Sequence, residues 1–177
     1  KDMKIFDHIH GYIKICKDAK KIIDTSEFQR LRNIKQLGCV YYVFPSASHN
    51  RFEHSLGVYN LSRKYMDILN LSGEYFNKKQ YKLISIAGLI HDIGHGPYSH
   101  NFDEFIKGKN HEYRSIEIFK FMNNKYKLNY SDDDIKFINN VIEPNYNVNN
   151  YLFQIISNKN GFDVDRVDYM LRDIKMT

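Results

Sequence analysis

The chain has 177 residues, 42% of them hydrophobic and 27% charged, which is the composition of one globular domain with its own hydrophobic core. No segment approaches the ~18 consecutive apolar residues of a membrane span, so the pattern argues against a membrane protein. The formal net charge of +5 suits an anionic ligand such as a nucleotide; it permits nucleic-acid binding without indicating it. Only two cysteines are present, Cys16 and Cys39, and they lack the Cys-x-x-Cys spacing of a zinc or redox motif, so we expect a reduced intracellular compartment, the nucleus or the cytoplasm.

The N-terminal part predicts a β-hairpin followed by a helix. Two short apolar segments, 4–6 and 12–15, flank residues 7–11, which is the pattern of two strands and a turn. Residues 24–27 then offer capping side chains for a helix that is expected to run to Lys35.

The middle of the chain predicts one extended segment and two long helices. The apolar run 40–44, ended by Pro45, is expected to be extended, and Ser48 is expected to cap a long helix. Residues 81–91 are almost wholly apolar, which predicts a helix in the centre of the core. Gly94 ends that helix, so His91 and its neighbour fall at its C-terminal end.

The C-terminal part predicts helices and loops. Helices are expected at 112–123, at 132–142 with Ser131 as the cap, at 151–157 and from 164 onward, with a polar loop at 145–150. The sequence has no internal repeat and no linker, so it predicts an all-α domain over 1–177 with a small N-terminal β-hairpin. Because the helical pattern continues at Thr177, we expect a piece of a longer protein that has further C-terminal helices.

The segment that follows the apolar helix is rich in side chains that bind metals. It contains His91, Asp92, His95, His100 and Asp103 within thirteen residues. Imidazole and carboxylate groups are well suited to hold a divalent metal beside an oxygen-rich substrate. Polar side chains at the end of a buried helix need partners, because an unpaired buried charge is costly, and a bound cation supplies one.

Two further segments complete a metal site. His54 lies on the first long helix and Asp165 at the start of the last helix. With His91 and Asp92 they give four ligands from three helices, which leaves positions for water and phosphate oxygens. Iron, manganese, magnesium and zinc all fit this set. A single histidine at a helix end is more often a cap or a core residue, so the interpretation depends on the four residues together.

The last helix carries further polar side chains on one face. Asp165, Tyr169 and Asp173 recur at i, i+4 and i+8. A ligand-binding wall and a solvated face with an ion pair both agree with this pattern. Arg166 and Arg172 lie to the side of it, where they would be available to a phosphate.

The order His54, His91-Asp92, Asp165 resembles that of the HD-domain metal-dependent phosphohydrolases. The chain is most similar to the deoxynucleoside triphosphate triphosphohydrolases, in the branch whose vertebrate member joins a sterile alpha motif to the HD domain. This likeness runs from about residue 4 to 173 and is carried by residues 28–32, 36–38, 42–45, 47–58, 91–97 and 163–165.

The resemblance implies an HD-type helical fold and hydrolysis of a dNTP to deoxynucleoside and inorganic triphosphate. The metal at the α-phosphate would be held by His54, His91, Asp92 and Asp165, and it would activate a water that attacks phosphorus. A homo-oligomer of the full-length protein is implied as well.

The resemblance also implies roles for side chains around the metal. Arg51, Arg166 and His95 would contact the phosphates, and His100 would be the general acid for the leaving 5′-oxygen, oriented by Asp103. Residues expected to support that network are His111 and Glu112. Residues expected to line the sugar and triphosphate pocket are Gln36, Leu37, Tyr169 and Asp173.

Three residues match positions at which vertebrate-type enzymes bind an activating guanine nucleotide, GTP or dGTP, between subunits. They are Asp24, Gln29 and Arg32. A helix cap with a surface ion pair is the plainer interpretation, and the sequence leaves both open.

Two other functions stay open. An HD phosphohydrolase that acts on another phosphoester, such as a nucleoside monophosphate or a cyclic dinucleotide, needs the same metal ligands. The additional residues Arg51, His95, His100, Asp103 and His111 argue against it. A non-catalytic module for nucleotides or single-stranded nucleic acid would use the positive charge and the 14 tyrosines, but it has no need of four intact metal ligands.

Overall fold

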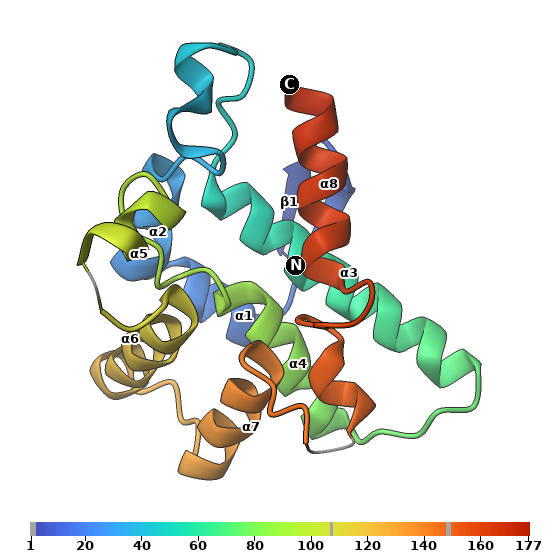
Figure 1. Ribbon diagram of the computed structural model, residues 1–177. Helices are drawn as coiled ribbons and strands as arrows, with labels where there is room; N and C mark the ends of the chain where they lie inside the picture. The colour runs from blue at the N-terminus through green and yellow to red at the C-terminus, as the bar shows by residue number, and fades with distance from the viewer. Residues whose placement is uncertain (1–2, 107, 148–149) are drawn as a thin grey trace.

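The computed structural model describes residues 3–106, 108–147 and 150–177, and it shows a helical fold with one N-terminal β-hairpin (Figure 1). Strands β1 (Met3–Asp7) and β2 (Gly11–Ile15) pair antiparallel. The side chain of Asp7 closes their turn by accepting hydrogen bonds from two backbone N–H groups, each at 2.9 Å. The predicted all-α class with a small hairpin is confirmed.

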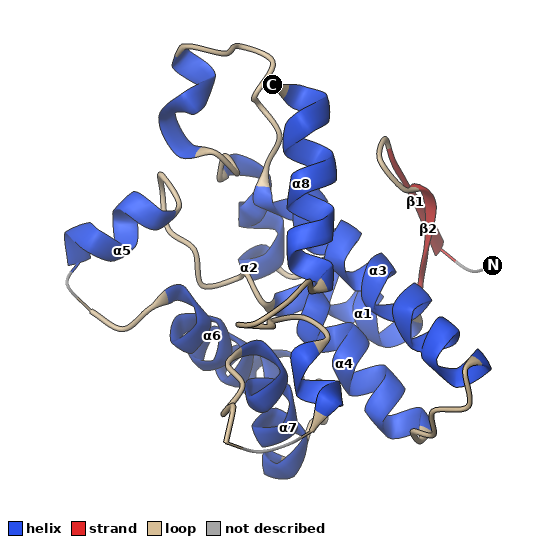
Figure 2. Ribbon diagram, turned by 45° about the vertical axis from the view of Figure 1, so that its right-hand side comes forward, coloured by secondary structure: helices blue, strands red, loops and turns tan. Residues whose placement is uncertain are grey.

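Two long helices form the centre of the molecule. Helix α3 (Arg51–Leu71) packs against α4 (Lys78–Ile90), α8 (Val164–Met176) packs against α3, and α7 (Asp132–Ile142) packs against α4. The C-terminal half of α4 is buried, as the apolar run predicts. Figure 2 shows the hairpin beside α3, which β2 contacts.

Shorter elements surround these helices. They are α1 (Lys17–Ile23), α2 (Ser26–Gln29), α5 (His100–Ile106), α6 (His111–Tyr126) and 3-10 helices at Arg30–Asn33, Gly38–Tyr42 and Tyr151–Gln154. Across the described ranges, no helix combines the length and the apolar character that crossing a membrane requires.

Two predicted elements before α3 are wrong. The run 40–44 is not extended, because the left-handed backbone of Gly38 (φ +56°) begins a 3-10 helix, and the apolar side chains that follow are exposed. The predicted helix to Lys35 ends early, at Gln29 with a 3-10 turn after it. The backbone of 34–36 bonds instead to 49–51, with N···O distances of 2.9 and 3.0 Å.

Other boundaries also differ from the prediction. Asn50, not Ser48, caps α3, because its side chain accepts from two backbone N–H groups of the first turn. The helix expected at 151–157 is a 3-10 helix of four residues, and α1 and α5 were not predicted. Helix α7 and its cap Ser131 lie where the sequence predicts them. The expected polar loop 145–150 falls partly outside the described residues.

Candidate metal centre and adjoining cavity

Local sequence positions two histidines at helix ends. The Asn50 cap starts α3, so His54 lies on the first turns of that helix. Helix α4 begins with a capping box at Asn77 and ends with His91 as its C-cap, beyond the buried apolar turns. Both histidines are buried, with 1% and 6% of their surface exposed.

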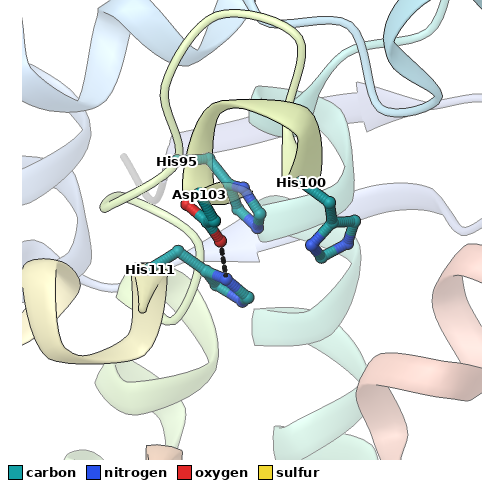
Figure 3. Close-up of side chains that lie close together, drawn as sticks. All are labelled: His95, His100, Asp103 and His111. Atoms are coloured by element: carbon teal, nitrogen blue, oxygen red, sulfur yellow. Dashed lines mark hydrogen bonds and ion pairs between the residues drawn. The ribbon is translucent and has the colours of Figure 1, made fainter. Parts of the chain in front are cut away.

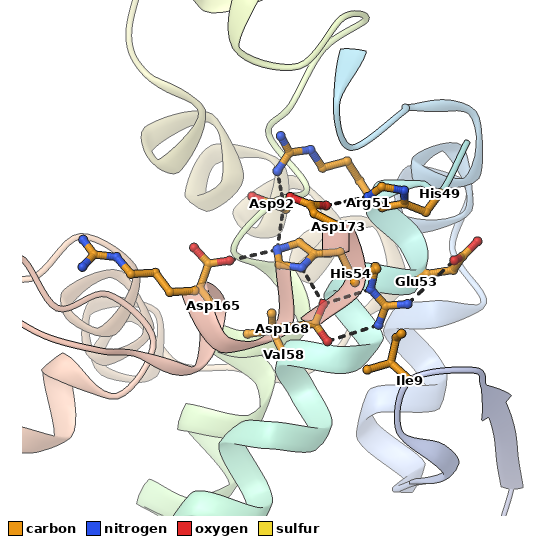
Figure 4. A network of polar contacts seen from close by, with 12 residues as sticks. Ile9, His49, Arg51, Glu53, His54, Val58, Asp92, Asp165, Asp168 and Asp173 are labelled. Carbon is orange, nitrogen blue, oxygen red and sulfur yellow. Dashed lines mark hydrogen bonds and ion pairs between the residues drawn. The ribbon is translucent and has the colours of Figure 1, made fainter. Parts of the chain in front are cut away.

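Four predicted ligands converge on one point, and we call them the metal quartet: His54, His91, Asp92 and Asp165. The Nε2 atoms of His54 and His91 lie 3.2 Å apart. Asp165 Oδ1 lies 2.9 Å from His54 Nε2 and 3.4 Å from His91 Nε2. Asp92 approaches the same two nitrogens at 3.4 and 3.5 Å. Figure 4 shows His54, Asp92 and Asp165 reaching this point from α3, the end of α4 and α8.

The hydrogen bonds of the two histidines leave their inner nitrogens free for a metal. His54 Nδ1 lies 2.8 Å from Asp168 Oδ2, and His91 Nδ1 lies 2.9 Å from the carbonyl oxygen of Gly88. Both partners are acceptors, so each Nδ1 carries a proton and each Nε2 faces the centre of the quartet, where a bound cation would take the place of the Nε2 proton. Imidazole suits zinc and iron, and carboxylate suits manganese and magnesium. The residues present therefore fit a divalent cation, as the sequence predicts.

The charges of the quartet also favour a cation. Burial lowers the pKa of His54, but the bonds to Asp165 and Asp168 outweigh burial and raise the pKa to about 10. Burial raises the pKa of Asp92, but Arg51 and His91 outweigh it and hold that pKa well below its usual range. The carboxylates thus stay ionised, and their field stabilises positive charge at this point.

A second group lies beside the quartet, and we call it the histidine cluster: His95, His100, Asp103 and His111 (Figure 3). The rings of His95 and His111 stack with centroids 3.9 Å apart, and His100 meets each of them edge-on at 5.0 and 5.3 Å. Asp103 Oδ2 lies 2.9 Å from His111 Nδ1, and its other oxygen accepts from Arg114. Asp103 therefore orients His111, and not His100 as the resemblance implies.

One cavity of about 220 Å³ joins the two groups. Its lining residues are Gln36, Leu37, Arg51, Asp92, His95, His100, His111, Asp165, Tyr169 and Asp173. Two buried polar atoms at the cavity, His95 Nδ1 and Gln36 Oε1, have no hydrogen-bond partner among the described residues, and His95 Nε2 lies 3.3 Å from Asp92 Oδ1. These orphaned atoms are available to a polar ligand.

Arg51 stands between the metal quartet and the histidine cluster. Its Nη1 atom lies 2.5 Å from Asp92 Oδ2, and its Nε atom donates to Ser99 Oγ at 3.2 Å. Burial lowers the pKa of His100, and the positive charges of Arg51 and His111 lower it further. An anionic ligand in the cavity would oppose that effect.

Some predicted residues lie away from the cavity. Arg166 donates to the carbonyl oxygen of Gly161 at 2.8 Å and is not among the lining residues. The prediction that Arg172 is available to phosphate is wrong, because its side chain is 2% exposed and is paired with Asp7 and Asp168. Glu112 Oε1 lies 3.4 Å from His111 Nε2, at the edge of the histidine cluster.

The three residues assigned to an activating nucleotide lie together near α2. Asp24 forms an ion pair with Lys20, and Gln29 Nε2 donates to the carbonyl oxygen of Ile23 at 2.8 Å. Arg32 Nε donates to Gln29 Oε1 at 2.8 Å, with its guanidinium 3.6 Å from the centre of the Phe52 ring.

Sequence reasoning missed several residues that hold the site. His49 Nε2 lies 2.7 Å from Asp173 Oδ1, and Arg114 binds both Asp103 and the carbonyl oxygen of Gly94. Asp168 and His10 contact one another behind His54. Only Asp168 had a signal in the sequence, since it stands four residues before an arginine on one helix.

Comparison with known proteins agrees with this geometry. The family model for the HD domain matches residues 51–170. A protein of Acanthamoeba polyphaga mimivirus that is named for an HD domain is 44% identical over 95% of this chain and 42% of its own length.

Two further relatives carry the name deoxynucleoside triphosphate triphosphohydrolase. The SAMHD1 homologue of Dictyostelium discoideum is 39% identical over 96% of this chain and 35% of its own length. SAMHD1 of Mus musculus is 42% identical over 97% of this chain and 31% of its own length. The chain thus spans less than half the length of these relatives. Since the HD match includes more than half of the chain and the whole metal quartet, the chain belongs to the HD domain family.

Proposed function

We propose that the protein hydrolyses deoxynucleoside triphosphates to deoxynucleoside and inorganic triphosphate with a divalent metal held by the metal quartet. One observation carries the proposal: the quartet carboxylates Asp92 and Asp165 line the same cavity as His95, His100 and His111. Relatives about 40% identical across nearly the whole chain bear the name of this activity, which supports the same substrate class here.

The side chains around the cavity have separable tasks. When bound, the metal supplies Lewis acidity and lowers the pKa of a water molecule. The phosphates receive hydrogen bonds from Arg51 and from one N–H of His95, whose ring is neutral because burial lowers its pKa to about 4. His100 gives its proton to the leaving 5′-oxygen, and it gains that proton when the anionic substrate offsets the positive charge of Arg51. Asp103 keeps His111 in place beside it.

The far side of the cavity is assigned to the sugar. Gln36, Leu37, Tyr169 and Asp173 line the cavity, and Asp173 Oδ1 lies 2.7 Å from His49 Nε2. Carboxylate and amide groups are suited to the hydroxyl groups of a sugar. Arg166 takes part in phosphate binding only after leaving Gly161, so its task is secondary to that of Arg51.

Activation by GTP or dGTP belongs to the same proposal and involves Asp24, Gln29 and Arg32. Arg32 and Gln29 form one surface pair beside α2, and a guanidinium there can bind a phosphate or a base edge of a nucleotide shared between subunits. A homo-oligomer of the longer protein is proposed with it.

The test uses the full-length protein with Mn²⁺ and with dGTP or dATP, with and without GTP, and separates the products by chromatography. We expect deoxynucleoside and intact triphosphate, a reaction lost in the His91→Ala/Asp92→Ala variant. Stepwise release of single phosphates would favour an HD phosphohydrolase for another phosphoester. Nucleic-acid binding that survives the double substitution, with no hydrolysis of any nucleotide, would favour the non-catalytic module.

A further inference from the structure

A fully buried carboxylate stands directly behind the metal ligand His54. Asp168, on α8, has 0% of its surface exposed, and its Oδ2 atom lies 2.8 Å from His54 Nδ1. Its Oδ1 atom lies 2.5 Å from His10 Nε2, a residue of the hairpin turn. Both oxygens are thus used by ring nitrogens that come from two different parts of the chain, and Figure 4 shows Asp168 beside His54.

A buried arginine holds this carboxylate from the other side. Arg172 Nε and Nη2 donate to the two oxygens of Asp168 at 3.0 and 3.1 Å, which is a bidentate pair. Arg172 Nη1 donates to Asp7 Oδ2 at 2.9 Å, and Asp7 closes the turn of the N-terminal hairpin. We call Asp7, Arg172 and Asp168 the buried relay.

Helix α3 packs tightly against the buried relay at Gly57. A Cβ atom added at Gly57 of α3 would lie 1.8 Å from Asp168 Oδ1 and 2.7 Å from Arg172 Nη2. Real Cβ atoms do not approach so closely, so the helices meet here only because residue 57 has no side chain. Two carboxylates and a guanidinium are costly to bury, and their mutual hydrogen bonds offset that cost only in this arrangement.

We propose that Asp168 is a positioning residue for the metal ligand His54, and that Arg172 and Asp7 hold Asp168, so that the N-terminal hairpin controls the metal affinity of the site. Asp168 fixes the ring orientation of His54 and the tautomer that presents Nε2 to the metal. The hairpin is far from His54 in sequence, but two ion pairs connect its Asp7 through Arg172 to Asp168, which contacts His54. This inference rests on the metal role proposed for His54 and does not depend on the substrate.

The experiment measures Mn²⁺ affinity of the full-length protein by equilibrium dialysis, with no substrate present. Asp168→Asn keeps the size of the side chain and removes its charge. We expect the Kd for Mn²⁺ to rise roughly 10–100-fold, the range seen when a carboxylate behind a histidine ligand is lost. Asp7→Asn, which touches neither the metal nor its ligands, is expected to raise the Kd several-fold.

Asp134→Asn is the matched control. It removes the charge that pairs with Lys79 and leaves an amide oxygen for the capping box of α7, and none of its partners belongs to the relay or the metal quartet. The Kd of the control should equal that of the unmodified protein. Circular dichroism in EDTA shows which variants are folded without metal.

The proposal is overturned if a folded Asp168→Asn or Asp7→Asn protein binds Mn²⁺ as tightly as the control. If Asp168→Asn does not fold, the Kd of Asp7→Asn for Mn²⁺ alone tests the proposal. Failure of the proposed dNTP hydrolysis would leave these affinities unchanged, so the two proposals can fail separately.

Discussion

At the scale of single residues, the site depends on the close packing at Gly57 and on the hydrogen bonds of Arg114. Gly57 permits the close approach of α3 and α8, and Arg114 joins the backbone of the His91-to-Pro97 loop to Asp103. Neither residue is a metal ligand. We expect Gly57 to affect the stability of the protein and Arg114 to affect its catalytic rate.

Gly57→Ala is expected to destabilise the protein by about 3 kcal/mol, because overpacking and the disturbed ion pairs of Asp168 and Arg172 add together. Urea unfolding measures this free energy. Gly161→Ala is the control, since its nearest atom is a flexible side-chain nitrogen of Asn158 at 3.0 Å, and it should cost under about 0.5 kcal/mol. Equal losses for the two variants would contradict the packing argument.

Arg114→Met is expected to lower kcat roughly 10–100-fold, because Asp103 loses its cationic partner and the His111 ring is free to move from the reactive geometry. The Mn²⁺ affinity should not change, as Arg114 contacts no metal ligand side chain. Steady-state kinetics with dGTP measure the effect. Arg63→Met on α3, which removes a similar bond to the backbone carbonyl of Lys14 in β2, should leave kcat intact.

At the scale of elements, the short helix α2 is tied to the end of α6 by side chains. Glu27 accepts from Lys125 at 2.8 Å and from the Tyr126 hydroxyl at 2.8 Å. These contacts join segments about a hundred residues apart. They place α2, which ends at Gln29, against the helix that carries His111.

The Glu27 pair predicts a dependence of stability on pH. Burial raises the pKa of Glu27, but the bond to Lys125 and the other hydrogen bonds outweigh it and lower the pKa to about 2, from 4.5 in the unfolded chain. A lowered pKa in the folded state stabilises the protein above pH 4.5, and this contribution is lost as the pH falls towards 2.

Glu27→Gln should therefore be less stable than the unmodified protein at pH 6, and the difference should shrink at pH 3. Urea unfolding of both proteins at the two pH values measures it. A difference that grows at the lower pH would have the wrong sign for this ion pair.

The elements that the sequence predicts best are those whose pattern is local. The buried helix α4 follows from an unbroken apolar run, and α7 follows from its cap and its periodicity. The run 40–44 misleads, because its β-branched and aromatic side chains are exposed, and the turn at Gly38 decides the backbone. Helix α5 has a sequence without clear periodicity and was missed.

In the candidate site too, residues in local motifs were predicted, and contacts between distant segments were not. The metal quartet was predicted because its members stand in recognisable short motifs, and the structure brings all four together. The contact between Asp7 and Arg172 joins residues 165 positions apart, and neither stands in a motif. Such contacts depend on how α8 packs against α3 and the hairpin, which no local pattern encodes.

At the scale of the whole molecule, the metal quartet joins three helices that are separate in sequence. His54 belongs to α3, His91 and Asp92 follow α4, and Asp165 lies in the first turn of α8. Figure 1 shows these three helices in the ribbon. A cation at this point adds a connection among these elements to the ion pair of Arg51 with Asp92 and the bond of Asp168 to His54. Metal binding should therefore stabilise the entire fold and not only the cavity.

Removing the metal is expected to lower the melting temperature. With Mn²⁺ at about 100 times its Kd, a ligand that binds only the folded state adds about 2.7 kcal/mol, or roughly 5–10 °C for a chain of this size. Calorimetry of the protein in EDTA and then in Mn²⁺ measures the shift. Asp165→Asn should lose the shift, because one of the four ligands becomes neutral while α8 keeps its cap at Asp163. An equal melting temperature in EDTA and in saturating Mn²⁺ would mean that the quartet does not bind the cation in the folded state.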